Sequence, residues 1–199
     1  MKKIIGVNKP KEEQQKCLKK ILLKSKKIKY VLETLEKYGL KNYYVAAGCI
    51  NQTVFNYYHD FDLDYGIKDI DIVYFDEDLS YEAEDKIIKE ITLLFDDNLF
   101  DVDIKNQARV HLWYENKFGF EIKPYTSVED AISKWGATVT CIGVRMEESE
   151  IIVYSAYGLD DLFNLIIRPV KEHFSKEQYK IKTKKWQDTW PLLKVIPWD

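Results

Sequence analysis

The sequence predicts an α/β or α+β protein in which strands and helices interleave. Two observations lead to this prediction. Segments with helical and strand-like periodicity alternate along the chain. Hydrophobic residues make up 46% and charged residues 32% of the 199 residues, which is typical of a globular domain with a substantial core. We expect an N-terminal helical segment over residues 1–40 and a domain over residues 41–199 that folds as one compact unit.

The first 66 residues predict three helices and a strand. Apolar residues recur at helical spacing over 10–38, where Ser25 divides two helices and Gly39 ends the second. The apolar run "YYVAAG" (43–48) predicts a strand, and "CINQTVFNYYH" (49–59) predicts the next helix. An acidic loop, "DFDLDYG", follows at residues 60–66.

The middle of the chain is predicted to continue with two strands around a helix. A strand is expected over 69–75, a helix capped by Ser80 over 81–96, and a short strand over 102–104. Residues 105–120 have no single periodicity, so they are predicted only as mixed structure.

The C-terminal part is predicted to contain a hairpin and three helices. The spacing of Thr126 and Glu129 fits a capping box at the start of a helix. The other elements are a hairpin of residues 138–146 with 150–156, a helix over 159–168 ended by Pro169, and a basic helix over 175–190.

Composition excludes several classes of protein. No apolar run approaches the roughly 18 residues that span a membrane, and the N-terminus has no apolar region typical of an export signal. Cys17, Cys49 and Cys141 are widely spaced, which argues against a disulfide framework and predicts a cytoplasmic protein. The formal net charge of −3 argues against a long nucleic acid as partner.

The stretch "GIKDIDIVYFD" (66–76) carries two aspartates in a strand that is otherwise apolar. Residues i and i+2 point to the same face about 6.6 Å apart, at ~3.3 Å per residue, so Asp69 and Asp71 lie side by side. Val73 and Phe75 continue this face, as in a covered central strand. One interpretation is a solvated strand face. The other is a metal site, because neighbouring carboxylates that are partly buried repel each other without a cation.

A third carboxylate, Asp103, lies on the next predicted strand, where Asp101 shares its face and competes for the same role. Oxygen ligands without nearby thiolates or imidazoles favour Mg²⁺ or Mn²⁺. Carboxylates on two neighbouring strands can hold two ions about 3.5–4 Å apart, an arrangement suited to phosphoryl or nucleotidyl transfer. Upstream, Gly48 at a helix start either lets the backbone approach a phosphate or only makes a tight turn.

These motifs resemble the nucleotidyltransferase superfamily of DNA polymerase β and the aminoglycoside nucleotidyltransferases. Its signature is Gly followed by Gly or Ser at a helix start, then Asp-x-Asp on a strand and a third acid on the next strand. The chain more closely resembles an uncharacterised bacterial nucleotidyltransferase-like family, formerly a domain of unknown function. The matching stretches cover most of residues 43–196: "VAAGCINQTVFNYYH", "DIDIVYFD", "VDIKNQARVHLWY", "YTSVEDAISKW", "TCIGVR", "YGLDDLFNLIIRP" and "KKWQDTWPLLKVI".

The resemblance implies a nucleotidyltransferase-like mixed β-sheet with flanking helices, and it implies roles for individual residues. Asp69 and Asp71 would ligate Mg²⁺ or Mn²⁺, and Asp103 would complete the second metal site and help to deprotonate an acceptor hydroxyl. The triphosphate of an NTP donor would be held at the helix start, by Gly48, Cys49 and Asn51. Cys49 stands where the superfamily has Gly or Ser, and a thiol donates poorly to phosphate.

Other polar and aromatic residues have two interpretations each. Lys105 and Arg109 either neutralise phosphate charge or, for Arg109, pair with an acid. His111 is expected to be structural, and Arg145 either reaches the cleft or is exposed. Three aromatic residues either stack on a base or belong to the core: Trp113, Tyr114 and Tyr125. The basic stretch 176–186 is expected to be a solvated helix face rather than an RNA contact.

Two hypotheses about function remain open. The first is an Mg²⁺-dependent or Mn²⁺-dependent enzyme that moves an NMP group from an NTP to a hydroxyl of a small molecule or protein and releases pyrophosphate. The second is a catalytically silent nucleotide-binding or metal-binding module, for which Cys49 is the main argument. Three carboxylates gathered at a cleft favour the first hypothesis, whereas an Asp103 held in a salt bridge favours the second.

Overall fold

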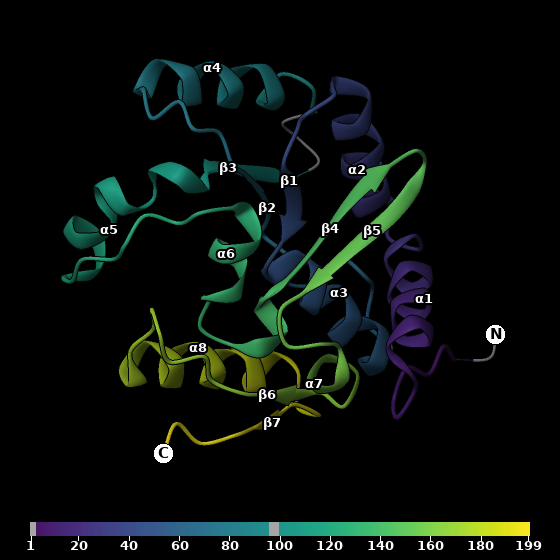
Figure 1. Cartoon of the computed structure of the whole chain (residues 1–199). Helices are drawn as coiled ribbons and strands as arrows, with labels where there is room; N and C mark the ends of the chain where they lie inside the picture. The colour runs from purple at the N-terminus through teal and green to yellow at the C-terminus, as the bar shows by residue number, and fades with distance from the viewer. Residues whose placement is uncertain (1–2, 96–99) are drawn as a thin grey trace.

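A five-stranded mixed sheet forms the centre of the fold in a computed structural model that describes residues 3–95 and 100–199 (Figure 1). The strand order is β3-β2-β1-β4-β5. Only β2 and β3 run parallel, and the other neighbours are antiparallel. The strands are β1 Tyr43–Ala46, β2 Asp69–Tyr74, β3 Asp101–Asn106, β4 Ile142–Glu147 and β5 Glu150–Ser155. The prediction of a mixed sheet with flanking helices is confirmed.

The two N-terminal helices, α1 (Lys11–Leu22) and α2 (Lys26–Tyr38), are separated where the sequence predicts. The hydroxyl of Ser25 accepts a hydrogen bond from the backbone N–H of Ile28, and Gly39 ends α2 in a left-handed conformation. Their apolar faces belong to the same core cluster as the sheet residues. The boundary near residue 40 stays a prediction about folding units.

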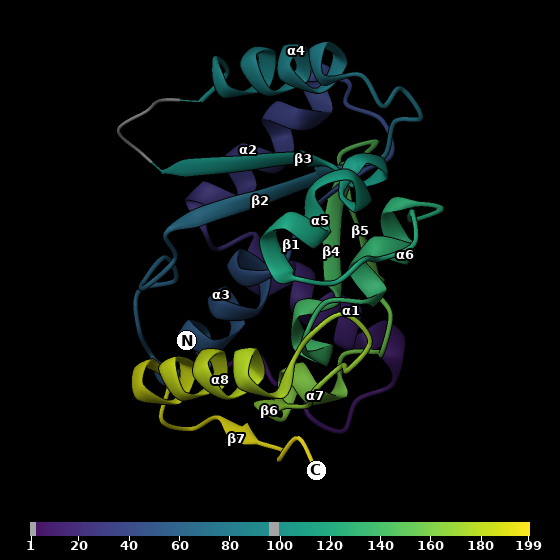
Figure 2. The ribbon, with the colours of Figure 1, turned by 90° about the vertical axis from the view of Figure 1, so that its left-hand side faces the viewer.

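Helices α3 (Gly48–His59) and α4 (Tyr81–Thr92) flank β2 in the chain. Ser80 caps α4 as predicted, accepting from the N–H of Ala83. The helix ends at Thr92 instead of continuing to residue 96, which lies outside the described residues. Figure 2 shows α4 and α8 on opposite sides of the molecule, with the sheet between them.

Strand β3 is longer than the predicted 102–104, because its parallel pairing with β2 extends over all six residues of each strand. The segment predicted only as mixed structure forms a 3₁₀ turn (Gln107–Arg109) and helix α5 (His111–Phe118), which ends at Gly119 in a left-handed conformation. Asn106 begins the turn by accepting a hydrogen bond from the N–H of Ala108.

The predicted capping box of α6 (Val128–Ser133) is wrong by one residue. Ser127, not Thr126, caps this helix and accepts a hydrogen bond from the N–H of Asp130. The carboxylate of Asp130 in turn accepts a hydrogen bond from the N–H of Thr126.

The predicted hairpin is confirmed, although its first strand begins at Ile142. Its two turn residues, Glu148 and Ser149, both have positive φ, as in the type I′ turns of tight hairpins.

The predicted helix over 159–168 is wrong beyond its first turn. Only Asp160–Phe163 are helical (α7), Leu165 has a φ of 57°, and Ile166–Ile167 form β6, which pairs in parallel with β7 (Lys194–Val195). Two consecutive β-branched residues favour the extended backbone.

The last helix is α8 (Lys176–Thr189). Ser175 caps its N-terminus and forms a capping box with Gln178. None of the helices in the described ranges combines the length and the apolar character needed to cross a membrane.

Candidate active site

The carboxylates singled out in the sequence lie on the two parallel strands. Asp69 pairs in register with Asp101, and Asp71 pairs with Asp103. Because paired residues of neighbouring strands share a face, and alternate residues of one strand do too, all four point to the same side of the sheet. Asp69 and Asp101 are exposed at the strand starts, whereas Asp71 and Asp103 are partly covered.

Asp71 is the electrostatic centre of this group. Burial, together with the nearby charges of Asp69 and Asp103, raises the pKa of Asp71 to about 6. Lys105 and Lys182 act in the opposite direction and lower it. The negative charge on this strand face is therefore only partly compensated by the protein.

The donor chemistry fits a divalent cation, although the side chains do not yet converge. Within residues 3–95 and 100–199, no three acidic, His or Cys side chains stand in an arrangement that could hold an ion. Asp103 forms a salt bridge with Lys105, two residues further along β3, and both side chains are more than a third exposed. Such an exposed pair contributes little to stability.

The turn from β1 into α3 brings a helix N-terminus to these carboxylates. Ala46 pairs with Asp71, and Ala47 follows in an unusual conformation, with φ 57° and ψ −130°. Such a backbone conformation costs a non-glycine residue about 1–3 kcal/mol and is commonly found at functional sites. At Gly48 an added Cβ would meet only the amide of Gln52, at 3.0 Å. The missing side chain therefore leaves the backbone open to a ligand.

Cys49 and Asn51 differ from the other residues predicted for this helix start, because both are buried. The thiol of Cys49 is 1% exposed and donates to the carbonyl of Ala46, and burial raises its pKa. Asn51 is fully buried, and neither atom of its side-chain amide has a hydrogen-bond partner among the described residues. A buried amide without partners is uncommon in folded proteins and calls for a water or a ligand.

A cavity of about 220 Å³ adjoins Asp71. Its charged and titratable lining comes from β2, β3, the turn after α6, the segment before α8, and α8: Asp71, Lys105, Lys134, His173 and Lys182. Trp113, Tyr114 and Tyr125 line the same cavity, as the interpretation of a base-stacking role requires. The amino group of Lys182 lies 5.8 Å from the ring centre of Phe174, and burial lowers its pKa, although the residue as a whole is exposed.

Sequence reasoning missed Lys182, Lys134 and His173. The stretch 176–186 is mostly a solvated helix face, as expected, but Lys182 alone turns into the cavity. No local signal separates it from the neighbouring lysines of α8, because its place in the cavity depends on residues that are distant in the sequence.

Arg109 pairs with an acid, which was the alternative to a role at the phosphates, and it lies away from the cavity at Asp71. Its guanidinium pairs with Glu84 of α4, both side chains being 13% exposed, and its Nε donates to the carbonyl of Leu79 at 3.0 Å. It is not among the residues that line the cavity at Asp71. His111 is half-buried at the start of α5, and its Nδ1 has no partner among the described residues.

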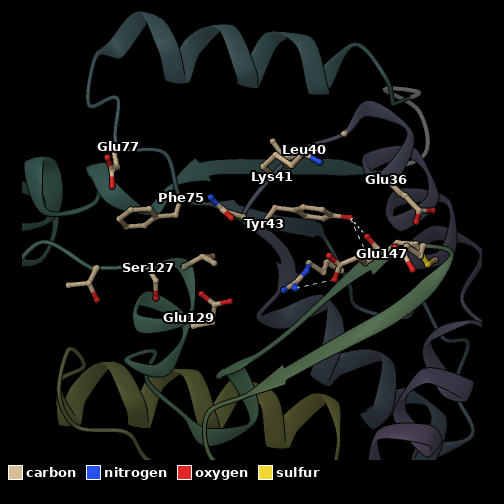
Figure 3. A pocket seen from close by; sticks show the side chains of 16 residues that line it. Glu36, Leu40, Lys41, Tyr43, Phe75, Glu77, Ser127, Glu129 and Glu147 are labelled. Atoms are coloured by element: carbon tan, nitrogen blue, oxygen red, sulfur yellow. Dashed lines mark hydrogen bonds and ion pairs between the residues drawn. The ribbon is translucent and has the colours of Figure 1, made fainter.

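A larger hollow of about 630 Å³ lies toward the opposite end of the strands (Figure 3). Arg145 lines this hollow and not the cavity at Asp71; its guanidinium stacks on Tyr44, 4.9 Å from the ring centre, and pairs with Glu147. Five glutamates face only Lys41 and Arg145 here: Glu36, Glu77, Glu129, Glu147 and Glu148. This excess of negative charge would repel a triphosphate, so the smaller cavity is the better candidate for an active site.

Comparison with known proteins agrees with this fold. A solved structure described as an NMR structure that "reveals a CCA-adding enzyme head domain" is 26% identical, with a TM-score of 0.74 over 92% of this chain and 95% of the other. A tRNA-processing enzyme complex (13% identity, TM-score 0.45) and a CCA-adding enzyme with CTP (12%, 0.48) match over 83% and 90% of this chain, and over 43% of each of theirs. No curated protein matches the chain significantly.

The family profile described as nucleotidyltransferase matches residues 33–195. This range begins within α2 and includes the whole sheet, both acid-bearing strands and α8. The match confirms the resemblance inferred from the motifs. The chain therefore belongs to the nucleotidyltransferase family.

Proposed function

We propose that this protein moves a nucleoside monophosphate from an NTP to a hydroxyl group of an acceptor and releases pyrophosphate, with Mg²⁺ or Mn²⁺ as cofactor. The observation that carries the proposal is the position of Asp71. It lies between Asp69 and Asp103, its pKa is raised by burial and by their charges, and it adjoins a cavity that Lys182 also lines. A site with this excess of negative charge favours a divalent cation.

Asp69, Asp71 and Asp103 would hold the metal, which supplies stabilisation of the charge that develops on the transferred phosphoryl group. Lys105 would leave Asp103 when the cation arrives and pair with a phosphate instead. Asp103 would also accept the proton of the attacking hydroxyl. The in-line geometry of such a transfer needs positioning and electrostatic stabilisation rather than covalent participation of the protein.

The triphosphate would lie at the start of α3, beside Gly48. The N-terminus of a helix attracts anions through its free N–H groups and its dipole. Cys49 is too deeply buried to donate to a phosphate in the observed conformation. The unpartnered amide of Asn51 lies one turn into the helix. It would support the phosphate site from below by hydrogen bonding to a buried water or to the backbone that binds the phosphates.

The acceptor is proposed to be a small molecule or a protein. The net charge of −3 disfavours a long nucleic acid. The likeness to a CCA-adding enzyme head domain makes the end of an RNA the competing acceptor. We also propose that the protein works in a reducing compartment such as the cytoplasm, because Cys17, Cys49 and Cys141 are all free thiols.

A catalytically silent nucleotide-binding module is the second candidate. Two observations favour it: the salt bridge between Asp103 and Lys105, and the burial of Cys49 at the position where the superfamily has Gly or Ser. Under this alternative the protein would bind an NTP without turning it over.

Calorimetric titration of each of the four NTPs, with Mg²⁺ or Mn²⁺, tests the proposal on the wild type and on the Asp69→Ala/Asp71→Ala variant. We expect metal-dependent binding of at least one NTP that the double variant loses, followed by release of pyrophosphate once an acceptor is supplied. Binding of no NTP to folded wild-type protein with either metal would refute the proposed function. Binding without pyrophosphate release across acceptor hydroxyls, including RNA ends, would favour the silent module.

A further inference from the structure

The walls of the cavity at Asp71 differ in chemistry. Asp71, Lys105 and Lys182 are charged and lie toward the strands and α8, and Lys134 adds a charge on the other side, 5.8 Å from the ring centre of Tyr125. The remaining wall is largely aromatic, and its rings come from α5, from the segments before and after α6, and from the segment before α8: Trp113, Tyr114, Phe118, Tyr125, Trp135 and Phe174. A ligand that matches both parts has a charged end and a flat, apolar end.

The aromatic wall packs against the core but is not fully covered by it. Tyr114 and Tyr125 are buried, but Trp113, Phe118, Trp135 and Phe174 remain partly exposed. Large rings that are incompletely covered within a concave surface are available for stacking. They line the cavity that also reaches Asp71, which distinguishes them from the scattered exposed apolar residues of the surface.

His173 adds one polar group to this wall. Its Nδ1 lies 3.1 Å from the hydroxyl of Tyr125, and its carbonyl accepts a hydrogen bond from the hydroxyl of Tyr114 at 2.8 Å. Burial raises the pKa of Tyr125 and lowers the pKa of His173, so both groups are favoured in their neutral forms. In the tautomer in which Nδ1 accepts a hydrogen bond from the phenol, the ring proton is on Nε2, from which it can be donated to a ligand.

The size of the cavity restricts which part of a nucleotide it can take. Its volume of about 220 Å³ is below the roughly 300–1,000 Å³ of pockets that enclose whole drug-sized ligands. It suits a base rather than a complete NTP. The triphosphate would then lie outside the cavity, between Asp71 and the start of α3.

We propose that this aromatic wall is the nucleobase subsite, in which the base stacks on Trp113 and an acceptor atom on its edge receives the Nε2–H of His173. This inference rests on the proposed function, because it assumes an NTP whose phosphates are bound at the aspartates. It assigns the choice among the four NTPs to α5 and to residues 173–174, and not to the strands that carry the acids. Figure 2 shows α5 above α8 on the side of the molecule that faces the viewer.

The test compares a ligand that has a base with one that lacks it. The Mg²⁺ complexes of the preferred NTP and of inorganic tripolyphosphate are titrated into the wild type, Trp113→Leu, Trp113→Phe and Leu112→Ala. Leu112 is the matched control, since it is 52% exposed on the same helix. We expect Trp113→Leu to weaken NTP binding by about 5- to 150-fold, the usual range for loss of one stacked base, and to leave tripolyphosphate binding unchanged.

Trp113→Phe should restore most of the NTP affinity, and Leu112→Ala should bind as the wild type does. His173→Phe should reduce the preference among the four NTPs by about 2- to 10-fold, the usual effect of one lost hydrogen bond. Unchanged NTP binding in Trp113→Leu, or an equal loss for both ligands, would overturn the subsite while the proposed function stands. If the wild type binds tripolyphosphate but no NTP, or binds neither ligand, both ideas fail.

Discussion

Replacing Asp71 by Asn should stabilise the protein at neutral pH while it abolishes metal-dependent binding. Asn has nearly the same shape as Asp and no charge, so the substitution removes the repulsion from Asp69 and Asp103 without making a cavity. Burial and this repulsion raise the pKa of Asp71 from 3.8 to about 6 in the folded protein. The folded state therefore holds the proton more tightly than the unfolded chain does.

The sign of the pH dependence follows from this difference. A carboxyl whose pKa is raised by folding contributes stability while it is protonated, and that stability is lost as the pH rises from about 4 through about 6. About two units of pKa at roughly 1.4 kcal/mol each give a cost of about 2–3 kcal/mol for ionised Asp71 at pH 7.5. Asp71→Asn should recover most of this free energy at pH 7.5 and only a few tenths of a kcal/mol near pH 4.

Urea unfolding followed by tryptophan fluorescence measures these free energies between pH 4 and 8, with and without Mg²⁺. Asp101→Asn is the matched control, because Asp101 is exposed at the start of β3, and it should change stability by less than about 0.5 kcal/mol. Mg²⁺ should stabilise the wild type and not Asp71→Asn. An Asp71→Asn variant that is no more stable than the wild type at pH 7.5 would show that Lys105 and Lys182 already compensate Asp71, and the reasoning would be wrong.

Three further substitutions separate the roles of the basic residues. Lys182→Gln should weaken Mg²⁺–NTP binding by about tenfold in calorimetry, the effect of losing one charge-assisted contact, whereas Lys185→Gln on the exposed face of α8 should not. Lys105→Gln should tighten binding of Mg²⁺ alone, because Asp103 loses its competing partner, and weaken binding of Mg²⁺–NTP, because a phosphate loses its lysine. If both affinities changed in the same direction, the proposed move of Lys105 from Asp103 to a phosphate would be contradicted. Arg109→Met should leave NTP binding unchanged and lower the free energy of unfolding by about 3 kcal/mol, because it leaves Glu84 in a half-buried site without its partner.

The acid-bearing strands were predictable because their signal is local. The alternation of Asp69 and Asp71 with apolar residues indicates one face of a covered strand, and the parallel register with β3 then brings Asp103 beside Asp71. The caps at Ser25 and Ser80 are local in the same sense.

Contacts between distant elements could not be predicted in this way. Arg109 is paired with Glu84, 25 residues away on another helix, and Lys182 of α8 lines the cavity beside residues of β2 and β3. The helix predicted over 159–168 failed for a related reason. Ile166–Ile167 pair with Lys194–Val195, and no periodicity within the segment itself reveals that partner.

The salt bridge between Asp103 and Lys105 does not by itself decide for the silent module. Both side chains are more than a third exposed, and pairs of this kind contribute about 0–1 kcal/mol. A divalent cation placed beside three carboxylates gains far more, since it also removes the repulsion that raises the pKa of Asp71. Under the proposed function, Lys105 would therefore exchange Asp103 for a phosphate of the bound NTP at little cost. The pair is thus compatible with the proposed role of Asp103, and the opposite effects expected of Lys105→Gln on Mg²⁺ and on Mg²⁺–NTP binding distinguish this role from the silent module.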